Sequence, residues 1–238
     1  MAEPHHDEDR AITRRSSLVK LGGLVVAALG AGGVAKVSES DAAGEGPAGV
    51  ASGAVTCVLT PEQTEGPYYI DGEKVRRNIT EGKAGTPLTL RLKVVNASTC
   101  KPIRGALVDI WHADAVGVYS GFGEGAASRT FMRGIQRTNA EGLAIFQSVY
   151  PGWYTGRTVH IHVKVHLGGS VVHTGQLYFP DAVTDAVYRR APYASRSGRT
   201  TRNASDSIFR NGGSKSLLAL RKPTSGYVGA ITMGVVRR

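Results

Sequence analysis

Apolar and polar residues alternate along much of the chain, and the alternation has a period of two. Residues 88–94 place leucine or valine at every second position, with threonine, arginine and lysine between them. Successive side chains of a β-strand point to opposite faces of a sheet, so this pattern predicts a strand with one face in the core. The same pattern predicts strands at residues 106–110, 143–149, 158–165, 171–179 and 227–236.

Turn-forming clusters separate these predicted strands. Residues 99–102, 139–142 and 168–170 combine glycine, proline or asparagine with small polar residues. No stretch keeps a 3.6-residue period between helix caps, and residues 181–222 have no regular period at all. Six or more short strands with such turns predict an all-β fold, either a sandwich or a barrel. We expect residues 181–222 to form loops or short helices that pack on the sheets.

The first 52 residues have the pattern of an export signal followed by a linker. Arg14 and Arg15 precede Leu18 and a glycine-broken apolar run at residues 21–35. That run is shorter than the ~20 residues of a membrane-spanning helix, and the paired arginines resemble a twin-arginine export signal. Leu18 stands one place later than the usual bulky residue of such signals, and a disordered basic tail is the alternative. We therefore divide the chain into residues 1–52, signal and linker, and residues 53–238, one folded β-sandwich or barrel domain.

The two cysteines, Cys57 and Cys100, both follow this segment. In an exported protein such a pair predicts one disulfide, which would stabilise the fold by about 4 kcal/mol in the chain-entropy relation. Two unrelated buried thiols are the alternative. Neither cysteine belongs to a CxxC or CxxH arrangement, which argues against cysteine-bound zinc.

Composition and charge narrow the range of partners. The chain is 41% hydrophobic and 20% charged, as in globular domains, and its formal net charge is +10. Six arginines gather between residues 189 and 210, but no helix-turn-helix, zinc-finger or RNA-recognition pattern accompanies them. We interpret this stretch as a solvated basic loop and expect no nucleic-acid partner. We also expect no stable membrane insertion after the signal has been removed.

The candidate chemistry begins with His160 and His162 on the strand predicted at residues 158–165. Alternation places both imidazoles on the face opposite the core, about 6.6 Å apart along the strand. That spacing lets them converge on one metal ion. The alternative is two polar residues on a half-exposed strand.

Two tyrosines near this strand favour the metal site. Tyr154 lies in the turn that precedes it, and Tyr119 lies in a loop that follows the strand at residues 106–110. A trivalent cation would hold both phenols as phenolates, although an ordinary tyrosine pKa is near 10. Two phenolates and one hydroxide balance Fe(III), and two neutral histidines complete five-coordination. The sequence therefore predicts an Fe(III) site.

Six segments resemble the intradiol ring-cleavage dioxygenases in their order and spacing. The resemblance covers roughly residues 57 to 182 and, more loosely, the C-terminal strand. The segments are Gly66–Tyr69, Asp109–Asp114 with Gly117–Ser120, Arg137–Gly142, Tyr150–Tyr154, Arg157–His162 and Gln176–Pro180. The chain lacks the N-terminal helical dimerisation region of catechol 1,2-dioxygenases and is more similar to the protocatechuate 3,4-dioxygenase beta-like, exported branch.

The resemblance implies an antiparallel β-sandwich core with long irregular loops and a mononuclear ferric site. Tyr119 and His160 would be ligands in one plane, and Tyr154 and His162 would be axial, with Tyr154 released when substrate chelates. Arg157 would stabilise charge that develops on the substrate ring. Gln176 would lie just outside the ligand set. The implied reaction combines a catechol-type aromatic with dioxygen and opens the ring between its two hydroxyl-bearing carbons. A cis,cis-muconate-type diacid would leave.

Three other interpretations compete with this one. His112 and Asp114 form an HxD pair that could join a distant histidine in an Fe(II) site. The paired histidines could instead bind copper, which leaves the two tyrosines unexplained. A secreted sandwich could also be a non-catalytic binding module, with Trp111 and Trp153 as stacking platforms. The sequence does not decide which catechol is the substrate or whether the chain forms a homo-oligomer.

Overall fold

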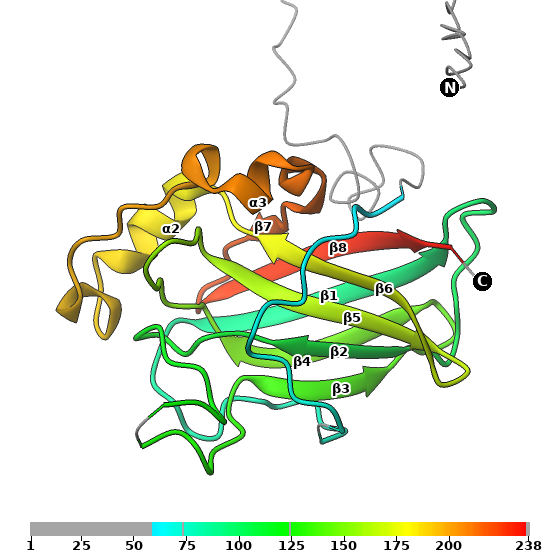
Figure 1. The fold of residues 1–238 in the computed structure, drawn as a ribbon, viewed down its shortest axis with the longest axis horizontal. Coiled ribbons are helices and arrows are strands. Elements are labelled where there is room, and N and C mark those ends of the chain that lie inside the picture. Colours follow the sequence, from blue (N-terminus) through cyan, green and yellow to red (C-terminus); the bar gives the residue numbers. More distant parts are fainter. Residues whose placement is uncertain (1–58, 73, 124, 237–238) are drawn as a thin grey trace, which may run out of the picture. The chain divides into compact units, whose positions relative to one another are not determined.

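The computed structural model describes residues 59–72, 74–123 and 125–236, and these residues form two four-stranded sheets (Figure 1). The strands of the first sheet, in spatial order, are β4 (Leu143–Val149), β1 (Pro87–Asn96), β8 (Tyr227–Val235) and β7 (Ala219–Arg221). Those of the second are β3 (Arg133–Arg137), β2 (Leu107–Trp111), β5 (His160–Leu167) and β6 (Ser170–Tyr178).

Strand pairing is antiparallel except at the centre of the first sheet. There β1 runs antiparallel to β4, with Leu90 opposite Phe146, and parallel to β8, with Leu90 opposite Gly229. In the second sheet β5 pairs antiparallel with both neighbours, so that His162 lies between Trp111 on β2 and Gln176 on β6. The register of the second sheet thus brings side chains from three strands to one position.

The core lies between the two sheets. The even-numbered residues of β1, from Leu88 to Val94, are at most 1% exposed and share one apolar cluster with Ile161, Val163 and Val165 of β5. The apolar side chains of the alternating pattern therefore face the core from both sheets, as predicted. The opposite face of β5 is also covered, because His160, His162 and Lys164 are buried there too.

The first described segment covers that opposite face (Figure 1). Thr60 donates a backbone hydrogen bond to Gly234 of β8, and Gln63 donates one to Thr174 of β6. Farther along, Val75 forms a bridge with Ile135 of β3. Residues 60–72 and 74–75 therefore cross the second sheet from β6 to β3, which removes its histidine-bearing face from solvent.

Residues 181–222 are mostly short helices and loops, as predicted. The helices are α2 (Asp181–Tyr188), α3 (Ser207–Arg210) and the 3-10 turns η2 (Tyr193–Ser195), η3 (Asn203–Ser205) and η4 (Gly213–Ser216). Figure 1 shows α2 and α3 on one side of the sandwich, near β6 and β8. Thr184 of α2 is buried, and its hydroxyl lies 2.7 Å from that of Tyr150. The segment is thus tied to the turn after β4.

The prediction that the arginines of residues 189–210 form a solvated loop is wrong for two of the six, Arg196 and Arg199. Arg199 has a side chain only 8% exposed and forms ion pairs with Asp181 and Asp185 of α2. Arg202 pairs with Asp185 at 2.6 Å, and Arg196 donates to backbone carbonyls. These guanidinium groups fix the segment to the domain, although the side chain of Arg202 is still 49% exposed.

The fold class is confirmed as an all-β sandwich, and the strands predicted at the six ranges are all present. The sequence pattern missed β3 and β7, which are short and carry few apolar residues. Residues 1–52, the predicted signal and linker, lie outside the described residues. Cys57 does as well, so its pairing with Cys100 stays a prediction. Among the described residues, no helix is both long and apolar enough to cross a membrane.

Candidate metal centre

His160 and His162 stand at the start of β5 with their imidazoles turned toward each other. The two Nε2 atoms are 3.0 Å apart, and the side chains are 3% and 1% exposed. Trp111 of β2 stacks on the His162 ring with a centroid distance of 4.9 Å and an interplanar angle of 5°. The neighbouring strand β2 thus holds the His162 imidazole by stacking, and β5 itself supplies both histidines.

The hydrogen bonds of His160 fix its tautomer. Its Nδ1 lies 2.6 Å from the carbonyl oxygen of Thr158, which can only accept, so we assign the ring proton to Nδ1. The Nε2 atom then carries a lone pair toward the site. Burial, and next the positive charge of Arg157, lower the pKa of His160 to about 3. The imidazole is therefore neutral, as a metal ligand must be.

His162 has the same charge state for a similar reason. Burial holds its pKa well below the usual range, and the neighbouring His160 lowers it further. Its Nδ1 is buried without a hydrogen-bond partner. Gly66, at φ +72°, passes close to the ring, because an added Cβ would lie 3.1 Å from Cε1. The first described segment thus closes over His162, and a glycine is what allows the approach.

Two phenols complete the cluster. The Tyr154 hydroxyl lies 3.0 Å from Nε2 of His160, and the Tyr119 ring lies 5.6 Å from the Tyr154 ring. Tyr68 stacks on Tyr119 at 4.2 Å. Tyr119 is 5% exposed and its hydroxyl makes no hydrogen bond, whereas Tyr154 is half-buried on a turn whose next two residues are exposed. The four side chains that the sequence singled out as ligands therefore come together.

The donor set fits a highly charged cation. Burial raises the pKa of Tyr119 well above 10 and also raises that of Tyr154. A buried phenol with no partner costs free energy unless something compensates it, and a bound cation would do so by holding the phenolate. No group of three His, Cys, Asp or Glu side chains suited to a metal occurs in the described part of the chain. A four-ligand site here therefore requires the tyrosines.

Arg157 lies beside the imidazoles and is held from two sides. Its Nη1 approaches Nε2 of His160 at 3.5 Å, its Nη2 donates to Oε1 of Gln176 at 2.5 Å, and its Nε donates to Asp206 at 2.8 Å. Gln176 in turn donates to the carbonyl of Thr64 at 2.9 Å. The guanidinium therefore has a fixed direction, which serves a charge that must face a reacting group.

Asp206 is a residue of this site that the sequence did not reveal. It is 1% exposed; one carboxylate oxygen accepts from Arg157 and from the Thr158 backbone, and the other caps α3 through the amides of Ile208 and Phe209. Burial alone would raise its pKa, but these donors outweigh it and hold the pKa below the usual range. Asp206 lies in the non-periodic segment, so no pattern placed it near residue 157.

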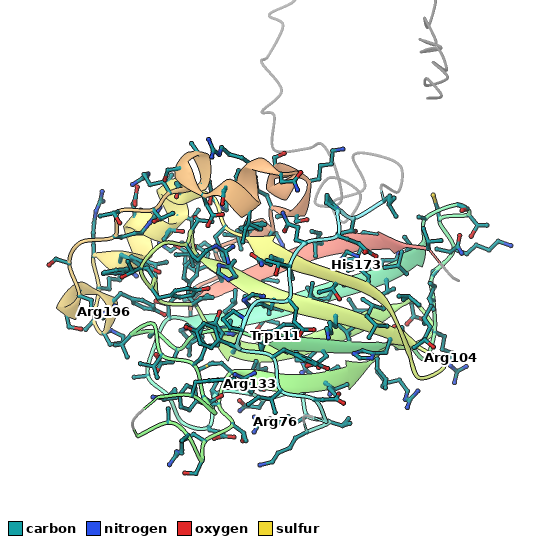
Figure 2. The ribbon with its side chains drawn as sticks, in the orientation of Figure 1. Arg76, Arg104, Trp111, Arg133, His173 and Arg196 are labelled. Atoms are coloured by element: carbon teal, nitrogen blue, oxygen red, sulfur yellow. The ribbon has the colours of Figure 1, made fainter. Side chains whose placement is uncertain are left out.

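Arg133 is a second residue that the sequence did not single out. Its side chain is 1% exposed, and it donates to the carbonyls of Tyr68 and Ser120, each at 2.7 Å. Tyr68 is the ring that stacks on Tyr119, and Ser120 follows Tyr119 in the chain. Figure 2 shows Arg133 below Trp111 on this face of the second sheet. A buried arginine that serves backbone carbonyls has no sequence signature.

The HxD pair does not form a metal site. His112 lies within hydrogen-bonding distance of the Ala113 carbonyl and the Ser148 hydroxyl, both at 2.8 Å, and burial lowers its pKa to about 4. Asp114 accepts from the backbone of Val116 and Val118 and pairs with Lys83 at 2.6 Å. Both side chains are thus used to shape the loop that leads to Tyr119.

The known proteins that this chain resembles are dioxygenases by name. A family model described as Dioxygenase matches residues 64–188. An intradiol ring-cleavage dioxygenase from Tetranychus urticae has 36% identity and a TM-score of 0.72, over 76% of this chain and 95% of that chain. The dioxygenase domain of a dioxygenase carbohydrate-binding protein fusion from Streptomyces sp. SirexAA-E has 32% identity and a TM-score of 0.60, over 76% and 100%.

A curated relative matches over a shorter region. Catechol 1,2-dioxygenase 2 of Acinetobacter lwoffii is 37% identical over 100 residues, which are 40% of this chain and 36% of that protein. The chain thus spans about a third of the length of this relative. Tyr119, Tyr154, His160 and His162 all lie within the residues that the family model matches, whereas Arg196 and Asp206 lie beyond them.

Proposed function

Because the chain belongs to the intradiol ring-cleavage dioxygenase family, we propose that it is a non-haem Fe(III) dioxygenase acting on a catechol-type aromatic. It opens the ring between the two hydroxyl-bearing carbons, adds both atoms of dioxygen, and releases a cis,cis-muconate-type diacid. The family as a whole implies non-haem iron. Catechol and chlorocatechol appear in the names of the curated relatives and are the first substrates to test.

The observation that carries this proposal is the convergence of four donors. The Nε2 atoms of two neutral histidines lie 3.0 Å apart, and the hydroxyl of Tyr154 lies 3.0 Å from one of them. Tyr119, with its unpartnered hydroxyl, is the fourth. We assign these four residues as the ligands of Fe(III), since two phenolates offset much of its charge and hard oxygen donors suit it. Bound Fe(III) supplies Lewis-acid activation of the chelated catechol toward dioxygen.

The two tyrosines differ in how firmly they are held, which supports different roles. Tyr119 is enclosed by Tyr68 and the second sheet, so it remains in place. Tyr154 stands on a turn whose Thr155 and Gly156 are exposed, so its side chain could move away when a substrate enters the site. As it leaves, its phenolate oxygen can accept one of the two hydroxyl protons of the substrate.

Arg157 supplies the positive charge that the reaction needs beside the substrate. A catechol bound as a dianion brings negative charge to the ring, and a fixed guanidinium stabilises that charge without reorganising. Asp206 and Gln176 hold Arg157 on the side of His160, so the charge is already oriented before substrate arrives. Gln176 thus acts by positioning Arg157 and need not touch the substrate.

Product analysis tests the proposal directly. Iron-loaded protein is incubated with catechol and with chlorocatechol under isotopically labelled dioxygen, and the products are identified by mass spectrometry. We expect a cis,cis-muconate-type diacid that carries two labelled oxygen atoms. A ring-opened aldehyde, or no consumption of either substrate by protein that retains stoichiometric iron, would contradict the proposed function.

We also propose that the protein is exported by the twin-arginine route. The support comes from Arg14 and Arg15 before the apolar run at residues 21–35. The test is a fusion of residues 1–52 to a reporter that is active only outside the cytoplasm. Export that is lost when both arginines become lysine, and that requires a functional twin-arginine translocase, is the expected result. Export that is unchanged in either case would contradict the route.

A further inference from the structure

The two loops that carry the tyrosines are linked by a single side chain from the arginine-rich segment. Nη1 of Arg196 donates to the backbone carbonyls of Val116 and Trp153, the latter at 2.7 Å. Val116 lies three residues before Tyr119, and Trp153 directly precedes Tyr154. One guanidinium nitrogen thus joins the backbone of both loops next to the phenols of the site.

The guanidinium also packs on the second loop. Its central carbon lies 4.3 Å from the centroid of the Trp153 ring, so the plane of Arg196 has a stacking partner as well as two acceptors. Lysine could reach the carbonyls with its ammonium group, but it could not reproduce this flat contact. The arrangement therefore uses properties of arginine in particular.

The two loops also approach each other directly, since the Gly152 amide donates to the Asp114 carbonyl at 2.8 Å, and glycines make room for Arg196 beside this bond. Gly117 has φ +81°, and a Cβ added there would lie 2.2 Å from both Nη1 of Arg196 and the carbonyl oxygen of Trp153. Gly152 is equally close to the first loop, since its added Cβ would lie 2.4 Å from the Ala115 carbonyl oxygen. Glycines at both positions allow the two loops to approach, and Arg196 occupies the space where their carbonyls meet.

Arg196 is itself anchored in the core. It follows η2, in which Tyr193 is 2% exposed and donates its hydroxyl to the Tyr150 carbonyl at 2.8 Å. The same hydroxyl accepts from the Thr86 backbone at 3.0 Å, and Tyr188 stacks on the Tyr193 ring at 5.3 Å. Figure 2 places Arg196 next to these short turns, at the end of the domain that holds the connecting loops. Arg196 therefore connects both loops to the core.

From these contacts we propose that Arg196 is a positioning residue of the metal centre. It sets the distance between the phenol oxygens of Tyr119 and Tyr154 by fixing the backbone of both loops, and it contacts neither the metal nor the substrate. The inference rests on the proposed function. It also gives the arginine-rich segment a role in the site, since Arg196 lies beyond the residues that the family model matches.

The test compares Arg196→Ala and Arg196→Lys with Arg190→Ala, which removes the same charge from an exposed position of the same segment. Three quantities are measured: Fe(III) affinity by chelator competition, the tyrosinate-to-iron absorption band, and hydrogen–deuterium exchange of the metal-free protein. We expect Arg196→Ala to weaken iron binding by about 10- to 100-fold and to shift the band. Exchange should rise in the peptides around residues 115–121 and 152–157 only. Arg196→Lys should recover part of each effect, and Arg190→Ala should match the unsubstituted protein.

The outcomes distinguish a failure of this inference from a failure of the proposed function. An unsubstituted protein that binds iron without a tyrosinate band would overturn the proposed function and this inference with it. If the unsubstituted protein has the band and Arg196→Ala keeps the same band, affinity and loop exchange, only the role of Arg196 is overturned. The same holds if Arg196→Ala merely lowers the melting temperature and leaves these three readouts unchanged.

Discussion

Nε of Arg157 donates a hydrogen bond to Oδ2 of Asp206 at 2.8 Å, although the two residues are 49 positions apart in the chain. The same carboxylate accepts from the Thr158 backbone at 2.7 Å and caps the first turn of α3. A single buried carboxylate therefore joins the short helices after α2 to the start of β5. The direction of the Arg157 side chain depends on that connection.

Asp206→Asn should slow catalysis while leaving the metal in place. The amide keeps the size of the side chain, but it carries no charge to hold the guanidinium. We expect kcat to fall by about 10- to 100-fold, with iron content and visible spectrum close to those of the unsubstituted protein. Steady-state kinetics with metal analysis on the same sample provide the measurement. An unchanged kcat would show that Arg157 does not need Asp206.

The same substitution predicts a change in how stability depends on pH. The folded-state pKa of Asp206 is held below its ordinary value, so the folded protein binds the proton less readily than the unfolded chain does. Its stabilising contribution is complete above the unfolded pKa of about 3.9 and is lost as the pH falls through the folded pKa. At pH 7 the unsubstituted protein should have a free energy of unfolding about 1 to 3 kcal/mol larger than that of Asp206→Asn, and this difference should shrink below pH ~4. Urea unfolding from pH 7 to 3 measures it, and a constant difference would refute the assignment.

Much of this site follows from the sequence because its parts are local. His160 and His162 share a face by strand alternation, and Tyr154 lies in the turn just before them. Arg196 and Asp206 could not be predicted. Each contacts a residue 40 or more positions away in the chain, and both lie in a segment that has no hydrophobic periodicity. For β3, the arginine at its first position hides the strand: Arg133 is buried because it donates to backbone carbonyls, and hydrophobic patterning does not report such a residue.

Tyr154→Phe should show that Tyr154 and Tyr119 have different roles. The other three proposed ligands remain, so we expect iron to bind more weakly but still to be detectable. Turnover should fall by about 10²- to 10⁴-fold, because the variant lacks the group that we propose accepts the substrate proton. Tyr227→Phe is the matched control, since Tyr227 packs near Tyr150 on the core side and belongs to no part of the site. Equal turnover in the two variants would rule out Tyr154 as ligand and base.

Gly117→Ala should destabilise the domain more than the same change at Gly105. Both glycines have positive φ, +81° and +82°, so an alanine costs about 1 to 2 kcal/mol at either position. At Gly105 an added Cβ meets nothing within 4 Å, whereas at Gly117 it lies 2.2 Å from Arg196 and from the Trp153 carbonyl. The crowding should add about 1 to 3 kcal/mol to the loss of unfolding free energy. Equal losses in denaturant unfolding would mean that the loops can separate at little cost.

The visible absorption spectrum of the purified protein, with its iron counted in parallel, tests the central claim most directly. Two tyrosinates on Fe(III) predict a red-brown protein with about one iron per chain, and a charge-transfer band that shifts when catechol is added without oxygen. Loss of the band in a Tyr119→Phe, Tyr154→Phe double variant would link it to these two residues. A protein that stays colourless after loading with Fe(III), or that binds copper in its place, would contradict the ferric tyrosinate site.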